Sequence, residues 1–401
     1  MLTETGAALP PQETPDSAAR LAREALHLFA ATPQSRDMPW DPGPMVLADH
    51  ARLEAGQLET TSAAWLERIP APPGPFSVFA GHAGLVMGLW HLSRAGLPDQ
   101  AVMKRTHARL RDELLLASRR AGWARPVRDW YDYDLVTGPA GLLLSMLPDG
   151  AVEAEQLAPV VAHLVGLLEA KDLAALRPDG CGADAQRRWN LGRVNLGLAH
   201  GVPGVIAALS GYTRRYAPED ERVYMALERA TGWLIAQAHR DRRGLTTWAP
   251  GSEAGLPDPA PASHREAWCY GAPANAWVIW EAGDVLDRPA FRSFALETFH
   301  AYASRFDPAF HLDRDPLERL AICHGAAGVM LIADAFVRHA GFAPAEALRG
   351  AMRELIEPRL GDVPAMMVAN PTMLSGASGV LSAIFTIQGG RRDWLSALGL
   401  R

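Results

Sequence analysis

The feature that most constrains the fold of this chain is a short glycine pattern that recurs six times, each time ahead of an apolar stretch. The pattern is Gly-x-x-Gly or a close variant, and consecutive copies begin 57, 63, 70, 54 and 51 residues apart. A small-residue signature at such a period indicates stacked supersecondary units. The six copies occupy residues 81–84, 138–141, 201–204, 271–274, 325–328 and 376–379, and the fourth has alanine in place of its second glycine.

Segments of a second kind lie between the apolar ones and carry a charged face with a stripe of leucines. Residues 17–31 and 99–120 are examples, and each predicts an amphipathic helix. A helix that is apolar on all sides is expected to be buried, with striped helices outside it. Because strand alternation is nowhere sustained, we expect an all-α fold. Apolar helices are predicted near 138–147, 201–212, 271–282, 325–338 and 376–387, and charged ones near 152–171, 218–239, 289–305 and 343–357.

Helical hairpins that recur in this way can close into a ring with a central cavity. Three longer connections, 120–137, 172–195 and 240–268, are expected over one end of it, where functional loops tend to lie. They contain Trp123, Trp130, Trp189 and Trp248. No linker divides the chain, so we expect one domain over residues 16–401, preceded by a disordered segment at 1–15.

Composition and charge narrow the class of protein. Apolar residues make up 48% of the 401 residues and charged residues 21%, which is the profile of a soluble globular protein. A net charge of −6 without a basic run argues against nucleic acid as the partner. The N-terminus lacks a signal-peptide pattern, and no apolar run approaches the ~18 residues that span a bilayer. The three cysteines form no CxxC and suit a reducing compartment, so we expect a cytoplasmic protein.

Two cysteines and a histidine stand beside the glycine pattern in a way that suggests a metal site. Cys323 and His324 directly precede the fifth copy, and Cys269 stands two residues before the fourth. Equivalent positions of stacked repeats converge, and thiolate and imidazole are good ligands for zinc. Three protein ligands would leave a fourth position open, as in catalytic zinc sites. The alternative for each cysteine is an inert buried thiol, which is the interpretation we favour for Cys181.

Four motifs together resemble the lanthionine synthetase C-like family, whose best-known members are the cyclases of lantibiotic biosynthesis. The resemblance extends over residues 81–387, in the order of the family, and the chain length resembles that of the stand-alone cyclases. The motifs are Trp268-Cys269-Tyr270-Gly271, Cys323-His324-Gly325-x-x-Gly328, Asn195-x-Gly-x-Ala-His200-Gly201-x-x-Gly204 and Asp134-x-x-x-Gly138-x-Ala-Gly141.

The resemblance implies an α/α toroid of seven inner and seven outer helices. One hairpin must then lack the glycine pattern, and we expect it within the first 75 residues. The implied reaction is the addition of a peptide cysteine to dehydroalanine or dehydrobutyrine, which forms a thioether ring. The implied partners are a dehydrated precursor peptide, a dehydratase and an export transporter, a complex that would hold the protein at the inner face of the membrane.

The resemblance also assigns roles to single residues. It implies that the two cysteines and the histidine of the metal motif bind one Zn²⁺. His200 and Asp134 match the acid–base pair of the family, and Arg265 matches its conserved arginine, a candidate to stabilise the enolate. Tyr270 is expected to help position the substrate.

Ordinary structural roles compete with each of these assignments. His200 is a candidate for a capping or core histidine, and Asp134 for a plain N-cap, with Asp132 as its rival for the acid–base role. His264 is an alternative cation to Arg265. His82, in the first copy of the pattern, is expected to be structural.

Other functions fit the sequence less well. A prenyltransferase subunit also combines a toroid with zinc, but it needs a basic pocket for a diphosphate, and no such cluster accompanies these motifs. A toroidal glycosidase needs two facing carboxylates and has no use for a Cys-His pair. The strongest rival is a non-catalytic protein that binds glutathione or other thiols. The presence of His200 and Asp134 beside the metal motif weakens that hypothesis.

Overall fold

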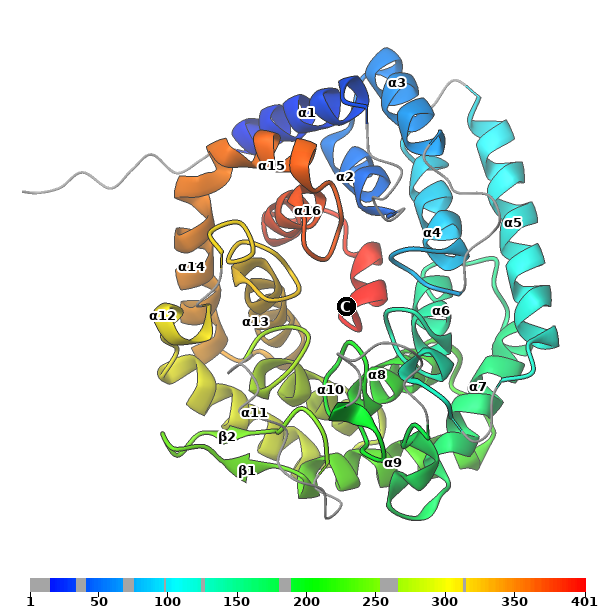
Figure 1. Ribbon diagram of the computed structural model, residues 1–401, viewed down its shortest axis with the longest axis vertical. Coiled ribbons are helices and arrows are strands. Elements are labelled where there is room, and N and C mark those ends of the chain that lie inside the picture. Colours follow the sequence, from blue (N-terminus) through cyan, green and yellow to red (C-terminus); the bar gives the residue numbers. More distant parts are fainter. Residues whose placement is uncertain are drawn as a thin grey trace, which may run out of the picture.

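Two concentric rings of helices make up most of the structure (Figure 1). The computed structural model describes residues 15–33, 41–67, 76–96, 99–123, 127–179, 189–252, 266–312 and 315–401. Within these residues seven helices form the inner ring, and every neighbouring pair around it is in contact, including the last with the first. The inner helices are α2 (Gly43–Ala51), α4 (His82–Leu92), α6 (Pro139–Met146), α8 (Val202–Tyr216), α10 (Ala272–Val285), α13 (Ala326–Ala340) and α16 (Ala377–Ile387).

The outer ring contains the leucine-striped helices. Its long members in the described chain are α1 (Pro15–Ala31), α3 (Ala55–Leu66), α5 (Gln100–Arg120), α7 (Ala154–Leu168), α9 (Glu221–Ala236), α11 (Pro289–Ser304) and α14 (Pro344–Ile356). Shorter elements are α12 (Pro308–His311), α15 (Val363–Ala369), the 3-10 helices η1 (Trp130–Asp132), η2 (Lys171–Leu176), η4 (Glu357–Asp362) and η5 (Asp393–Leu398), and a hairpin of β1 (His239–Arg240) and β2 (Thr246–Thr247). The predicted alternation of inner and outer helices is confirmed.

The hairpin without the glycine pattern is α1 with α2, which lies within the first 75 residues as expected. Its inner helix begins after Asp41-Pro42 instead of a Gly-x-x-Gly. Domain boundaries stay a prediction: α1 begins at Pro15, and residues 1–14 of the segment predicted to be disordered lie outside the described residues.

The second glycine of the pattern is needed because the preceding loop folds back onto the first turn of the inner helix. A Cβ atom at Gly141 would lie 1.9 Å from the carbonyl oxygen of Leu135, and one at Gly379 would lie 1.8 Å from that of Met373. Such contacts with backbone atoms leave no room for any side chain. The pattern therefore marks a close backbone approach, repeated around the ring.

Neighbouring loops are joined by backbone hydrogen bonds at this end of the ring. Leu135 N–H donates to the Ala199 carbonyl (3.3 Å), and Ala199 N–H donates to that of Cys269 (3.4 Å). Cys269 N–H donates to Cys323 (3.4 Å), whose N–H donates to Leu374 (2.8 Å). Five successive units are thus linked directly, which brings the residues just before each inner helix together.

Asp41 joins the last unit to the first. One carboxylate oxygen accepts the N–H of Gly43 at 2.7 Å and the N–H of Met373 at 2.8 Å, across 332 residues of sequence. The Trp65 indole donates to the Asp41 carbonyl at 2.8 Å. Burial is the main cause that raises the pKa of Asp41 to about 7. A buried carboxyl group thus links the last unit to the first, in addition to the packing of α16 on α2.

The C-terminal segment lies inside the ring (Figure 1), in the space where the sequence suggests an open cavity. η5 enters the ring, where Trp394 and Leu398 are fully buried. The indole of Trp268 donates to the Leu398 carbonyl (2.9 Å), and that of Trp277 donates to the Gly399 carbonyl (3.0 Å). A short apolar segment after the last repeat has no periodicity that would reveal this role. Trp268 precedes Cys269, so the segment supports a loop of the candidate site.

Candidate metal centre and acid–base pair

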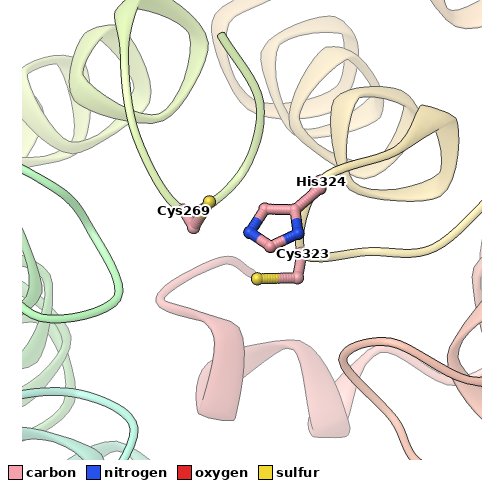
Figure 2. A group of neighbouring side chains, drawn as sticks. All are labelled: Cys269, Cys323 and His324. Atoms are coloured by element: carbon pink, nitrogen blue, oxygen red, sulfur yellow. The ribbon is translucent and has the colours of Figure 1, made fainter. Parts of the chain in front are cut away.

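Cys269, Cys323 and His324 lie together at the loop end of the ring (Figure 2). One ligand atom from each, the two Sγ atoms and an imidazole nitrogen, lies within 4.8 Å of the others. Cys269 is buried, and the other two side chains are half-buried. The described chain contains no other group of three His, Cys, Asp or Glu residues in such an arrangement.

The repeat places these side chains. Cys269 and Cys323 each stand two residues before the first glycine of their copy, and the hydrogen bond between their backbones holds the two loops side by side. The Cys269 loop is the unusual one, since Gly271 has a φ of +90°, a conformation that strongly favours glycine. The same copy has Ala274 instead of a second glycine. This loop therefore follows a backbone path of its own.

The chemistry of the donor set fits a zinc ion. Within the described residues neither cysteine forms a disulfide, and the two lie close to each other and to one imidazole. Two sulfurs and one nitrogen are ligands of a borderline-soft metal, whereas Mg²⁺ and Ca²⁺ prefer oxygen. Three ligands also match the number that a catalytic zinc takes from the protein.

His200 and Asp134 form a close pair across two units. His200 Nδ1 lies 2.5 Å from Asp134 Oδ2. The other oxygen of Asp134 accepts the N–H (2.7 Å) and the hydroxyl (2.9 Å) of Thr137, so this fully buried carboxylate is fixed on both sides. Only 26% of the His200 side chain is exposed. Such a pair can orient an imidazole for proton transfer.

The rival carboxylate, Asp132, has a different task. It accepts the backbone N–H groups of Arg128 and Asp129 and so caps the turn η1. His82 lies at the start of α4, and burial lowers its pKa. Arg265, its alternative His264 and Cys181 lie outside the described residues. Their roles stay predictions.

The contact of Trp130 with His200 was not predicted from the sequence. The Trp130 ring stacks on the His200 imidazole, with centroids 4.6 Å apart and planes 20° from parallel. The sequence suggests only that Trp130 lies near one end of the ring, because stacking depends on the fold of η1. Of the other loop tryptophans, Trp248 is buried and donates to the Leu234 carbonyl (2.8 Å).

Tyr270 follows Cys269 on a loop of the metal cluster, and this loop adjoins the one that carries His200. Its hydroxyl accepts a hydrogen bond from Asn195 Nδ2 at 3.0 Å, and its ring packs against Gly197. Asn195 is fully buried and was also missed, although it belongs to the motif that contains His200.

Glu266 holds the Cys269 loop in place. One of its oxygens accepts the Ala272 N–H at the start of α10 (2.6 Å), and the other accepts the Thr247 hydroxyl. The Tyr302 hydroxyl donates to the Glu266 carbonyl at 2.7 Å. Burial raises the pKa of Glu266 to about 7. The loop is thus fastened at both ends by a group that sequence reasoning did not single out.

Comparison with known proteins identifies the family. The family described as lanthionine synthetase C-like protein matches residues 63–397. The chain belongs to this family. Among curated proteins, the nisin biosynthesis protein NisC of Lactococcus lactis subsp. lactis is 22% identical over 272 residues, which are 65% of this chain and 62% of that protein. The chain thus spans less than two thirds of that relative.

A solved structure of nisin cyclase matches the fold. It has a TM-score of 0.74 and 18% sequence identity, and the match covers 96% of each chain. The fold of this member of the family is accordingly an α/α toroid, as the sequence predicts. No helix in the described part of the chain is both long and apolar enough to cross a membrane.

Proposed function

We propose that this protein is a zinc-dependent lanthipeptide cyclase. It adds cysteine thiols of a peptide to dehydroalanine or dehydrobutyrine residues and so forms lanthionine or methyllanthionine rings. The observation that carries this proposal is that two groups of side chains lie on adjoining loops. One is the candidate metal cluster of Cys269, Cys323 and His324, and the other is the pair of His200 with Asp134. Family membership and the toroid agree with this chemistry.

The first requirement of the reaction is a deprotonated peptide thiol, and the metal cluster would help to supply it. A free cysteine thiol has a pKa of about 8.5, so little thiolate exists at neutral pH. Cys269, Cys323 and His324 would hold the zinc ion, and the charge of a bound zinc would favour the deprotonated form of the peptide thiol. The protein fixes the three ligands through the backbone bond between the two loops.

The second requirement is a proton for the enolate, which the acid–base pair supplies. When sulfur bonds to the β-carbon, the π-electron pair of the double bond moves toward the carbonyl and leaves an enolate, which needs a proton at Cα. His200 delivers this proton, and Asp134 fixes its ring through Nδ1, so that Nε2 is the nitrogen that faces the peptide. Trp130 stacks on the ring and restricts its orientation. Arg265 would stabilise the enolate.

The substrate of this reaction is an extended peptide that brings both reacting residues into the site. Holding both residues of the peptide there supplies the proximity term of the rate. We propose a dehydrated precursor peptide as substrate and a dehydratase as the enzyme that supplies it. A complex with that dehydratase and an export transporter would operate at the inner face of the membrane, in the cytoplasm.

The proposal is tested with a dehydrated, leader-bearing precursor peptide. Cyclisation changes no mass, so free thiols are alkylated at intervals and counted by mass spectrometry. We expect the protein to consume thiols faster than the uncatalysed rate, which is measured separately and subtracted. The undehydrated precursor is the control and should keep all its thiols. If thiols are lost no faster than the uncatalysed rate and the protein binds glutathione, the protein is better described as a non-catalytic thiol-binding scaffold.

A further inference from the structure

Two asparagines occupy the same position in different repeats. Asn195 and Asn370 each stand six residues before the first glycine of their copy. The backbone carbonyl of each accepts the first N–H of the inner helix, that of Val202 at 3.0 Å and that of Ala377 at 3.0 Å. A Cβ atom on the glycine, Gly201 or Gly376, would lie 2.3 Å from that carbonyl oxygen in both cases. The two loops are therefore matched in backbone geometry.

Their side chains differ in what they bind. Both polar atoms of the Asn370 side-chain amide bind within its own loop. Oδ1 accepts from Thr372, and Nδ2 donates to the Ser375 carbonyl at 3.3 Å. Asn195 Oδ1 accepts the Gly197 N–H at 2.9 Å, but its Nδ2 crosses to the next unit and donates to the Tyr270 hydroxyl at 3.0 Å. The loop itself needs only the first of these bonds, so the second requires another explanation.

The ring of Tyr270 is seated by the same loop. A Cβ atom at Gly197 would lie 2.4 Å from the ring of Tyr270, so only glycine permits this packing. Tyr133, which is fully buried, interacts electrostatically with both Asp134 and Tyr270, and this places the Tyr270 hydroxyl in the surroundings of the acid–base pair. Because Asn195 donates to that hydroxyl, the hydrogen of the hydroxyl is directed to an acceptor other than Asn195.

We propose that Asn195 is a positioning residue, which acts through Tyr270 and aims the Tyr270 hydroxyl at the peptide during cyclisation. This inference rests on the proposed function. Asn195 itself touches no reacting atom. Its contribution is to fix the direction of one hydroxyl group, and Gly197 fixes the ring that carries it.

The test is a double-mutant cycle of Asn195→Ala and Tyr270→Phe, with cyclisation rates measured at low and saturating peptide. We expect each single substitution to lower kcat/KM by about two- to tenfold, the effect of one hydrogen bond. The double substitution should lower kcat/KM no further than Tyr270→Phe alone, because Tyr270→Phe already removes the hydroxyl that Asn195 contacts. Additive losses, or a Tyr270→Phe variant with wild-type kinetics, would overturn the proposal.

Asn370→Ala is the matched control. It removes the equivalent side chain from a loop that carries none of the proposed site residues, and its amide binds only within that loop. It should therefore change the melting temperature to a similar extent and leave kcat and KM unchanged. If Asn195→Ala fails to fold, Asn195→Asp keeps the acceptor for Gly197 and takes its place in the cycle. A wild-type protein that cyclises no dehydrated peptide overturns the proposed function. An active wild type with additive substitutions overturns only the role of Asn195.

Discussion

At the scale of single residues, the positions just before an inner-helix glycine decide what each loop contributes. Two positions before it the chain has Cys269 or Cys323, and one position before it His200 or His324. Hydrogen bonds between the loops align these positions, so residue types at equivalent places assemble a site, although the Cys269 loop departs from the common backbone path at Gly271. Each ligand can therefore be removed with little effect on the fold.

Cys323→Ala should remove most of the zinc that the wild-type protein carries. The two remaining ligands, Cys269 and His324, cannot hold the ion as firmly as three. The measurement is elemental analysis of purified protein, with one zinc per chain expected for the wild type. Cys181→Ala is the control and should keep its zinc. Full occupancy in Cys323→Ala would remove that residue from the ligand set.

At the scale of helices and loops, the glycine pattern carried most of the information that sequence reasoning used. It located six of the seven inner helices, because their apolar length and their glycines recur together. The helix α2 escaped it, since Asp41 and a Pro-Gly-Pro sequence replace the pattern there. η5 escaped it as well, because a segment of six residues has no period to read. The contact of Asn195 with Tyr270 depends on the packing of two units and has no local signal.

The glycine requirement predicts a large difference between two Gly→Ala substitutions. Gly379→Ala places a Cβ atom 1.8 Å from the Met373 carbonyl oxygen, so the loop must move, at a cost of about 1–3 kcal/mol or more. Gly350→Ala, on the outer helix α14, meets nothing within 4 Å and should stabilise the protein by about 0.5–1 kcal/mol. Thermal unfolding of both variants tests this. Equal melting temperatures would show that the close approach is not required.

At the scale of the whole molecule, Asp41 links the last unit to the first beside the packing of α16 on α2, and the C-terminal segment lies inside the ring. A closed ring fixes the relative placement of loops that are far apart in sequence, so the candidate site is a property of the entire fold. Sequence reasoning foresaw the convergence of the loops because the units repeat. It did not foresee which side chain would close the ring.

Asp41→Asn should flatten the dependence of stability on pH. The pKa of Asp41 is raised from 3.8 to about 7 in the folded protein, so between these values the folded state binds more protons than the unfolded state. Stability from this group is therefore present at low pH and is lost as pH rises through about 7. Asparagine keeps the acceptor for both N–H groups without a charge.

The measurement is the difference in unfolding free energy between wild type and Asp41→Asn, from pH 4 to pH 8. We expect the variant to gain on the wild type by up to a few kcal/mol over this range, at about 1.4 kcal/mol per pKa unit. Glu266, whose pKa is also raised to about 7, titrates in both proteins and cancels in the difference. A difference that is constant over this pH range would contradict the assigned role of Asp41.

Under the proposed function, the ring brings together two separate groups of side chains, one that would hold a metal and one that moves a proton. His200→Ala tests this division most directly, with zinc content and cyclisation rate measured on the same preparation. The variant keeps Cys269, Cys323 and His324, so we expect full zinc with a rate lower by about two to four orders of magnitude, the range for a lost general acid. A wild-type rate would make His200 a structural histidine, and a loss of zinc would show that it belongs to the metal centre.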